Sequence, residues 1–427
     1  MKFRTKEALS ISMIYIMSVI FTGCNAQTKL PEASAAYDKE TTVQTAIGAL
    51  TLPSPYAEKS QVKLSNIQGW KDGQTPRAPV GFTVTRFAEE LKHPRWAYVG
   101  PNNDVFVAES NTRFSANQIT MLRDTDGDGK PEIQVVFAEG LNCPFGMLIL
   151  KGYFYVANTD GLYRWAYTPG QEKLEGGGEK ILDLPAGGYN NHWTRNLLQN
   201  ADGSKIYISV GSASNVGEHG IEEELRRACI LEINPDGSGE KIYASGLRNP
   251  VGMDWNPANG ELWTAVNERD KLGDNLVPDY LTSVKQGGFY GWPYSYFGQI
   301  KDPRWSDSPN DDSVKKALVP DVPLGSHTAS LGLAFYTGDS FPERYKNGAF
   351  VGQHGSWNRS NFSGYKVVFV PFENGKPQQP QDFLTGFIAD GDGSKVFGRP
   401  VGVTEMPDGS LLVLDDDSGI VWQVSAR

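Results

Sequence analysis

The sequence has few cysteines, and their scarcity limits its chemistry. Only three occur in 427 residues: Cys24, Cys143 and Cys229. No Cys-x-x-Cys-His segment is present, so the chain has no attachment site for a c-type haem. Cys143 and Cys229 alone do not make a disulfide framework, although an exported chain would permit a bridge. We expect two free or buried thiols, with one disulfide as the alternative.

The sequence also lacks an excess of positive charge. Lysine and arginine total 40 against 50 aspartate and glutamate residues, a formal net charge of −10. This acidity argues against nucleic acid or anionic lipid as the main partner. No Walker loop, Gly-x-Ser-x-Gly, His-Glu-x-x-His or dinucleotide-binding fingerprint occurs.

Long apolar runs are missing except near the N-terminus. A basic start precedes an apolar stretch from Ala8 to Phe21, which is too short for a comfortable membrane span. It ends in Thr22-Gly23-Cys24, which resembles a bacterial lipobox. We therefore expect a lipoprotein signal peptide at 1–23, lipidation of Cys24, and a lipid-anchored tether and extended segment at 24–80. A plain secretory signal is the alternative. The predicted location is the bacterial cell envelope, on its periplasmic or outer-membrane face, with membrane contact through the anchor only.

Glycine and aromatic residues, in contrast, are plentiful. The chain has 47 glycines and 11% aromatics, a composition that favours short strands and many turns. Between residues 81 and 427 a turn followed by a strand pair recurs six times, and the first four units are about 50 residues apart. The turns are Leu91–Ala97, Gly140–Gly146, His192–Leu197, Gly246–Gly252, Ala329–Ala334 and Gly398–Val403. The pattern predicts an all-β, six-bladed β-propeller whose sixth blade is completed by a strand at Phe82–Phe87.

Polar residues recur at matched positions of these turns. His192, Arg248, Asn249 and Arg399 occupy such positions, as do Arg95 and Asn142. A propeller brings such residues together around its central channel. Any one of them is as readily a turn cap or a solvated side chain, but the combination suits a planar polyanion. Guanidinium groups bind carboxylates through two hydrogen bonds, and a neutral histidine can accept a proton from a hydroxyl.

Six segments together carry a family resemblance. They are Asn191–Asn196 (NHWTRN), Gly246–Pro250 (GLRNP), Asn267–Asp270 (NERD), Gly287–Pro293 (GGFYGWP), Gly355–Arg359 (GSWNR) and Gly398–Gly402 (GRPVG). With them the chain resembles the soluble pyrroloquinoline quinone (PQQ)-dependent glucose/sorbosone dehydrogenase family, in particular its sorbosone and pyranose dehydrogenase branch.

The resemblance implies roles for individual residues. His192 matches the catalytic base, and Arg248 lies near the quinone carbonyls, where negative charge develops. Arg248, Asn249 and Arg399 match cofactor-binding residues. The backbone of Arg269 and Asp270 matches the segment that holds a cofactor-bound calcium ion.

The chain departs from the glucose dehydrogenase branch at two places. Phe397 stands where that branch has a second arginine, and the segment Gln353–Arg359 lacks its lysine. We expect His354 to replace the lysine as a cofactor ligand, with Arg359 as a further candidate. Asn142 and Trp357 complete the predicted cofactor-binding set.

The implied function is a PQQ- and calcium-dependent oxidation of a sugar or related polyol, with hydride transfer to the quinone and His192 as base. A separate electron acceptor, a cytochrome or a quinone, is then required. The Arg248→Ala variant is expected to keep its fold and to bind the cofactor weakly. Two alternatives remain: a propeller lactonase with calcium-activated water, and a non-enzymatic lipoprotein that binds glycan or protein.

Three further features remain outside this assignment. Asp124–Gly129 resembles the start of an EF-hand loop, but the twelfth position is Val135 rather than glutamate, so a hairpin turn and a second calcium site both stay open. Asp415–Asp417 is expected to end a strand in a solvated loop. His327 precedes the fifth unit and can reach the channel.

Overall fold

The computed structural model describes residues 39–111, 115–307, 309–389 and 394–427. The predicted signal peptide, the lipidation site Cys24 and the tether as far as residue 38 lie outside the described residues. Within these four ranges, no helix combines the length and apolar character that a membrane crossing needs.

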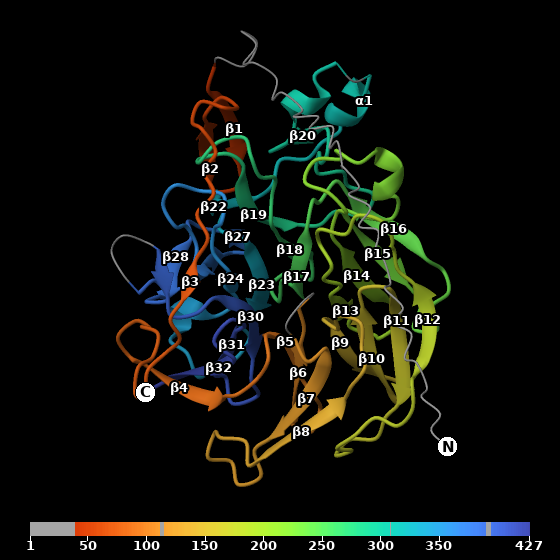
Figure 1. Ribbon diagram of the computed structural model, residues 1–427, viewed down its shortest axis with the longest axis vertical. Coiled ribbons are helices and arrows are strands. Elements are labelled where there is room, and N and C mark those ends of the chain that lie inside the picture. Colours follow the sequence, from red (N-terminus) through yellow and green to blue (C-terminus); the bar gives the residue numbers. More distant parts are fainter. Residues whose placement is uncertain (1–38, 112–114, 308, 390–393) are drawn as a thin grey trace, which may run out of the picture.

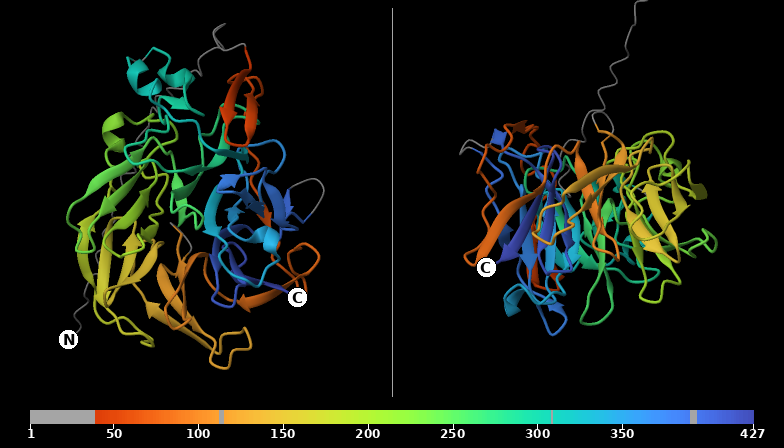
Figure 2. Two further views of the ribbon diagram at one scale, coloured as in Figure 1. Left: turned by 180° about the vertical axis from the view of Figure 1, so that it is seen from behind. Right: turned by 90° about the horizontal axis from the view of Figure 1, so that it is seen from below.

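Six four-stranded antiparallel sheets surround a common centre, as Figures 1 and 2 show. The first blade contains β5 (Pro94–Val99), β6 (Val105–Glu109), β7 (Gln118–Arg123) and β8 (Ile133–Ala138). The second contains β9 (Met147–Leu150), β10 (Tyr153–Asn158), β11 (Gly161–Ala166) and β12 (Glu179–Asp183). The third contains β13 (Leu197–Gln199), β14 (Ile206–Val210), β15 (Cys229–Ile233) and β16 (Lys241–Ser245).

The remaining blades carry the longer insertions. The fourth contains β17 (Pro250–Trp255), β18 (Leu262–Val266), β19 (Pro278–Ser283) and β22 (Val322–Ser326). The fifth contains β23 (Ser330–Phe335), β24 (Ala349–Gln353), β25 (Lys366–Val370) and β28 (Gln381–Leu384). The sixth contains β30 (Pro400–Glu405), β31 (Leu411–Asp415), β32 (Ile420–Ala426) and β4 (Phe82–Ala88). The predicted six-bladed propeller is confirmed.

Short elements lie outside the six blades. The strands are β1 (Thr41–Thr45), β2 (Gly48–Leu52), β3 (Asn66–Ile67), β20 (Ser295–Tyr296), β21 (Ile300–Lys301), β26 (Phe372–Glu373), β27 (Lys376–Pro377) and β29 (Lys395–Val396). The helical turns are η2 (Ile221–Glu224), η3 (Pro303–Trp305), α1 (Asp311–Val314) and η4 (Glu343–Tyr345).

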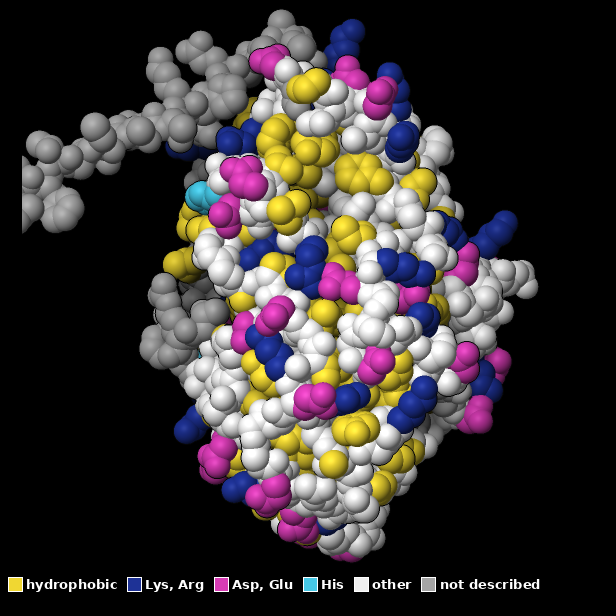
Figure 3. All heavy atoms as spheres, turned by 90° about the vertical axis from the view of Figure 1, so that its right-hand side faces the viewer, with side chains coloured by type: hydrophobic (Ala, Val, Ile, Leu, Met, Phe, Trp, Pro, Cys, Tyr) yellow, Lys and Arg dark blue, Asp and Glu magenta, His cyan; other side chains and the backbone are white. Residues whose placement is uncertain are grey.

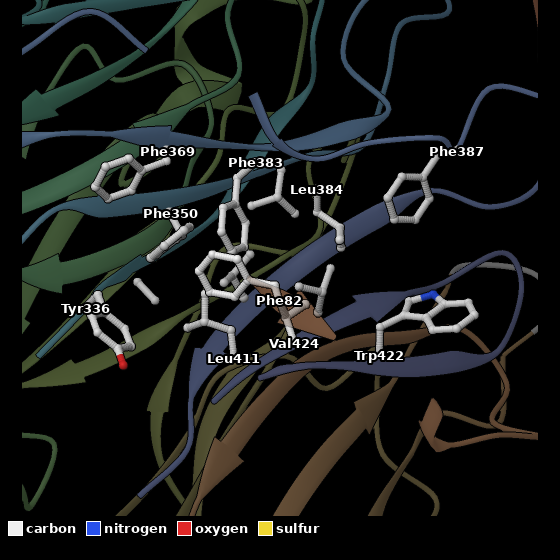
Figure 4. Packing of buried hydrophobic residues seen from close by; sticks show 14 of the residues in the cluster. Phe82, Tyr336, Phe350, Phe369, Phe383, Leu384, Phe387, Leu411, Trp422 and Val424 are labelled. Carbon is white, nitrogen blue, oxygen red and sulfur yellow. The ribbon is translucent and has the colours of Figure 1, made fainter. Parts of the chain in front are cut away.

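The ring closes where the N-terminal strand β4 joins the last strand. β4 pairs antiparallel with β32, with Val84 opposite Val424 and Phe82 opposite Ala426. This confirms the predicted closing strand. Figure 4 shows Phe82 in an aromatic cluster with Phe350 and Phe383 of the fifth blade. The pairing of β4 with β32 leaves neither strand's facing edge open to water, and burial of Phe82 in this cluster stabilises the closure.

Glycines let the innermost strands approach one another closely. A Cβ atom on Gly332 of β23 would lie 2.2 Å from the carbonyl oxygen of Val401 in β30. A Cβ on Gly252 of β17 would lie 2.5 Å from the backbone nitrogen of Leu333. The glycines of the repeated turns thus fix the distance between neighbouring blades and the width of the channel.

The Gly332→Ala variant is expected to lose about 1–3 kcal/mol of unfolding free energy, because the added methyl overpacks the contact between β23 and β30. Urea denaturation measures the loss. The control is Gly177→Ala, where the added methyl meets no atom within 4 Å. Equal unfolding midpoints for the two variants would contradict the close packing of the inner strands.

Both cysteines in the described residues are free and buried, which confirms the expectation of two free or buried thiols. Burial raises the pKa of Cys229 to about 12. Since the thiolate is the reactive form of cysteine, Cys229 is chemically inert near neutral pH.

The charged surface is mixed in sign. Figure 3 shows one side of the molecule, on which acidic and basic side chains alternate and do not gather by sign. This side therefore offers no extended basic area for nucleic acid, which agrees with the acidic composition.

Candidate active site

A cavity opens at the centre of the ring, where turns of five blades meet. Its lining includes six of the predicted site residues: His192, Asn249, Asp270, His354, Trp357 and Arg399. These residues come from positions up to 207 apart in sequence, from 192 to 399. The propeller thus brings most of the predicted set together on one cavity.

His192 is held in one orientation by the loop that follows β14. Its Nδ1 lies 2.9 Å from both the carbonyl oxygen and the hydroxyl of Ser212. The carbonyl can only accept, so Nδ1 carries the proton and Nε2 presents a lone pair. Asn191 Nδ2 lies 3.4 Å from that Nε2. Burial, with the nearby charge of Arg248, lowers the pKa of His192 to about 3, so the ring is neutral at physiological pH.

A second group of charged residues forms one wall of the cavity. Arg95 Nη1 binds Asp416 at 2.5 Å, and His354 Nε2 lies 2.9 Å from the same carboxylate. Arg399 donates to the carbonyl oxygens of His354 and Gly355 at 3.0 and 3.1 Å. Burial raises the pKa of Asp416, but His354 and Arg95 outweigh it and hold that pKa well below its usual range. Arg95, His354 and Arg399 line this wall, and the ionised Asp416 lies behind it, bound to Arg95 and His354.

This wall corrects the expectation for Asp415–Asp417. Asp415 and Asp416 are buried, with exposures of 0% and 3%, and so do not lie in a solvated loop. Asp415 ends β31 and accepts from the backbone nitrogen of Arg399 and from Trp70 Nε1. The solvated-loop interpretation was wrong because buried partners such as Trp70 and Arg95 come from the opposite end of the chain, where the local sequence gives no sign of them.

Arg248, buried beside the cavity, forms an ion pair with Asp270 of the cavity lining. Arg248 is 1% exposed and does not line the cavity; its guanidinium binds Asp270 Oδ2 at 3.0 Å. Asp270 Oδ1 lies 3.3 Å from His327 Nδ1, and His327 Nε2 donates to the carbonyl of Gly273 at 2.8 Å. Burial lowers the pKa of His327, but its bonds to Asp270 and Gly273 outweigh this and raise it overall, which favours the imidazolium.

Three other predicted residues lie away from the cavity lining. Asn142 binds Asp160 at 3.0 Å in a separate pocket between the first two blades. Arg359 donates to Asn275 Oδ1 at 2.8 Å, and Arg269 forms a buried ion pair with Asp302.

Sequence reasoning left several lining residues without a role. Asn267 and Trp193 lie within the motifs that carried the family resemblance, so their position in these motifs could have identified them as lining residues. Arg95 was recognised only as a matched turn position; its guanidinium stacks over Trp193 with its carbon 5.4 Å from the ring centroid. No local signal marked Asp416 as its partner, because the two are 321 residues apart.

The cavity fits a planar, polyanionic cofactor. Arg95 Nε and Asn249 Oδ1 are buried polar atoms that have no hydrogen-bond partner among the described residues. Trp193 and Trp357 add flat aromatic surface to the same lining, and Arg399 adds a second guanidinium. The guanidinium donors of Arg95 and Arg399 are appropriate for the carboxylates and ring oxygens of PQQ, and Asn249 Oδ1 can accept from an N–H or O–H group.

The oxygens of Asp270, in the predicted calcium segment, are all engaged by protein groups. The Asp270 carbonyl accepts from Asn215 Nδ2 at 3.1 Å and from Arg269 Nη1 at 2.8 Å, and both carboxylate oxygens have protein partners. Calcium binding at Asp270 would require these contacts to change, and the calcium site stays a prediction. Elsewhere, one carboxylate oxygen each of Asp124, Asp126, Asp128 and Glu132 lies within 4.8 Å of the others on a largely exposed hairpin, so the turn and calcium interpretations of that loop both stay open.

Comparison with known proteins agrees with the fold. A protein of Borreliella burgdorferi described as uncharacterized is 29% identical over 365 residues, which cover 82% of this chain and 90% of that protein. The PQQ-dependent pyranose dehydrogenase of Coprinopsis cinerea is 32% identical over 306 residues, but the match covers 55% of this chain and only 40% of that enzyme. The solved holo structure of the PQQ domain of a Coprinopsis cinerea pyranose dehydrogenase superposes with a TM-score of 0.68 at 20% identity, covering 85% of this chain and all of that one.

One family model also matches most of the chain. It is described as a domain of unknown function, DUF7133, and it matches residues 74–423. This range begins just before β4 and ends within β32, so it contains almost the whole propeller. The chain belongs to the DUF7133 family, and its domain is a six-bladed β-propeller of the kind found in PQQ-dependent sugar dehydrogenases.

Proposed function

We propose that this chain is a PQQ-dependent oxidoreductase that oxidises a sugar or related alcohol. One observation carries the proposal: a neutral histidine, whose unprotonated Nε2 has only a 3.4 Å contact with Asn191 Nδ2, lines the same cavity as two arginines, and two of its lining residues carry an unpartnered buried polar atom. The similarity to an enzyme named as a pyranose dehydrogenase supports a sugar as substrate. A sorbosone-type substrate, calcium dependence, a lipid anchor and a separate cytochrome or quinone acceptor remain parts of the proposal.

When bound, PQQ would supply the oxidising power by accepting a hydride from the carbinol carbon. His192 accepts the hydroxyl proton at Nε2, so the substrate loses one hydride and one proton and becomes a carbonyl compound or a lactone. Arg399 and Arg95 would bind the carboxylates, and Asn249 Oδ1 and Asn267 would orient polar groups. Trp193 and Trp357 would flank the ring system and exclude water. These steps use no calcium-bound oxygen.

The cavity is less suited to the alternative of a lactonase. Such an enzyme needs several inward carboxylates to hold calcium, whereas Asp270 is the one carboxylate among the described lining residues, and it is bound by Arg248 and His327. Reconstituting the apo-protein with PQQ and calcium, followed by a screen of sugars with an artificial acceptor, tests the proposal. Sugar-dependent acceptor reduction is expected; failure to bind PQQ would overturn it.

The Arg399→Ala variant is expected to bind PQQ about 10–100-fold more weakly, since a hydrogen bond to a charged group contributes about 1.5–3 kcal/mol. Absorbance titration of the apo-protein measures the dissociation constant. Arg304→Ala, which removes an exposed arginine of η3, is the control and should bind as the parent does. Unchanged affinity in Arg399→Ala would remove this residue from the cofactor site.

A further inference from the structure

The carboxylate of Glu224 is buried outside the cavity, against the loop that follows β14. Glu224 ends η2 and is 8% exposed. Its Oε2 accepts from the backbone nitrogen of Ala213 at 2.8 Å. Its Oε1 accepts from the backbone nitrogen of Ser214 at 3.0 Å and from the Ser214 hydroxyl at 2.5 Å. Three donors of two adjacent residues therefore converge on one carboxylate.

These three hydrogen bonds from Ala213 and Ser214 to Glu224 are called the clamp below. On one side of the clamp, the loop holds His192. Ser212 directly precedes the clamped residues, and its hydroxyl donates to the carbonyl of Ser214 at 2.6 Å. Because its one proton is used there, the Ser212 hydroxyl faces His192 Nδ1 as an acceptor, as the Ser212 carbonyl does. Both contacts require the proton on Nδ1. A free histidine side chain prefers its proton on Nε2, so the protein imposes the less common tautomer.

On the other side of the clamp, the loop holds Arg248 and Asp270 through Asn215. The Asn215 carbonyl accepts from Arg248 Nε at 3.0 Å, and Asn215 Oδ1 accepts from Arg248 Nη2 at 2.9 Å. The same Oδ1 accepts from the Asp270 nitrogen at 2.9 Å, and Nδ2 donates to the Asp270 carbonyl at 3.1 Å. A displacement of this loop would move the base and the buried ion pair together.

We propose that Glu224 is a positioning residue that holds the loop 212–215 and thereby fixes the Nδ1–H tautomer of His192. The kinetic consequence rests on the proposed function, whereas the tautomer of His192 does not. Glu224 neither lines the cavity nor contacts His192, so its effect reaches the cavity through the loop alone.

The Glu224→Gln variant tests the clamp with almost no change in volume. A glutamine side chain offers one acceptor oxygen, and its NH₂ group would face one of the backbone N–H groups. The loop must then shift, and Ser212 no longer presents both acceptors to Nδ1. Glu222→Gln is the matched control, because Glu222 lies on the same helical turn and its side chain is exposed.

The first readout is the tautomer of His192 in the apo-protein. The chain has only five histidines, so ¹⁵N-histidine labelling gives a small set of side-chain signals, and the His192→Gln spectrum assigns the one in question. The parent and Glu222→Gln are expected to show the Nδ1–H form. Glu224→Gln is expected to show a mixture with the Nε2–H form. An unchanged tautomer would overturn the inference.

The second readout is kinetic. The PQQ-loaded Glu224→Gln enzyme is expected to lose about 10–100-fold in kcat with little change in KM, since small misplacements of a catalytic group have effects of this size. A changed tautomer with a parental kcat would overturn the catalytic part. If the parent oxidises no sugar although Glu224→Gln still changes the tautomer, the proposed function fails and the positioning of His192 stands.

If Glu224→Gln does not fold, the Ser214→Ala variant provides a second test. Ser214→Ala removes the hydroxyl that binds Glu224 and accepts from the Gly217 nitrogen at 2.8 Å, while the backbone contacts remain. A smaller change in the same direction is expected for both the tautomer and kcat. No change in either would count against Glu224 as the residue that positions the loop.

Discussion

His192→Gln is expected to lower the rate of substrate-driven PQQ reduction by about 10²–10⁴-fold while the cofactor still binds. An amide cannot take a proton at neutral pH, and the side chain is close in size to imidazole, so the cavity should keep its shape. His192→Ala should lose as much activity. Single-turnover reduction of bound PQQ, compared with the melting temperature of the same sample, measures the effect.

The pH dependence gives a second test of the same role. Because the pKa of His192 is lowered to about 3, the ring stays neutral between pH 8 and pH 5. Protonation of His192 should therefore not reduce the parent rate until the pH falls well below 5. An acid limb centred near the ordinary histidine pKa of about 6.5 would show that another group is the base or that the site is solvated.

A merely structural role for His192 predicts the opposite pattern. If the ring only packs beside Trp193 in its turn, the variants lose stability and keep near-normal activity per folded molecule. His219→Gln is the control, because His219 is exposed and contacts Tyr189 with ring centroids 4.1 Å apart. A folded, PQQ-loaded His192→Gln enzyme that works at the parent rate would remove His192 from the mechanism.

The ring itself could be predicted because its signals are local and repeated. Each blade starts with a turn of similar sequence, and alternation marks strands such as Lys366–Val370, which is β25 exactly as bounded. The closing strand β4 was recognisable because it alternates and lies just before the first turn. Once the ring is known, residues at matched turn positions must approach the channel, and this placed His192, Asn249 and Arg399 correctly on the cavity.

The direction of each side chain could not be predicted in the same way. Arg248 and Asn249 are adjacent, but Asn249 lines the cavity whereas Arg248 turns into the loop at Asn215. Asn142 occupies a matched turn position, yet its amide reaches Asp160 in the neighbouring hairpin. Such choices depend on partners that the repeat does not encode, including Asp416, which reaches Arg95 across the closing contact between the first and last blades.

Arg248→Ala is expected to lower the free energy of unfolding by about 3–5 kcal/mol, the usual effect of removing one partner of a buried ion pair. The sequence alone suggested that this variant would keep its fold. The structure indicates a different outcome, because the guanidinium also donates to the carbonyl oxygens of Asn215, Asn267 and Glu268 at 3.0, 3.2 and 2.6 Å. The substitution removes the guanidinium donor from the carbonyl oxygens of Asn267 and Glu268, whereas the Asn215 carbonyl keeps Trp292 Nε1 and the Asp270 carboxylate keeps His327. Urea denaturation of the apo-protein measures the loss.

A double-mutant cycle separates the ion pair from the carbonyl contacts. Asp270→Asn keeps the shape of the carboxylate and removes its charge, so the cycle with Arg248→Ala isolates the Arg248–Asp270 coupling, expected at about 1–3 kcal/mol for a contacting pair. Lys315→Ala is the exposed control; its pair with Asp312 is 71% and 90% exposed and should contribute about 1 kcal/mol or less. If Arg248→Ala unfolds at the same urea concentration as the parent, the contacts of Arg248 do not contribute measurably to the free energy of unfolding. Weak PQQ binding by that stable variant would then restore its role as a direct cofactor ligand.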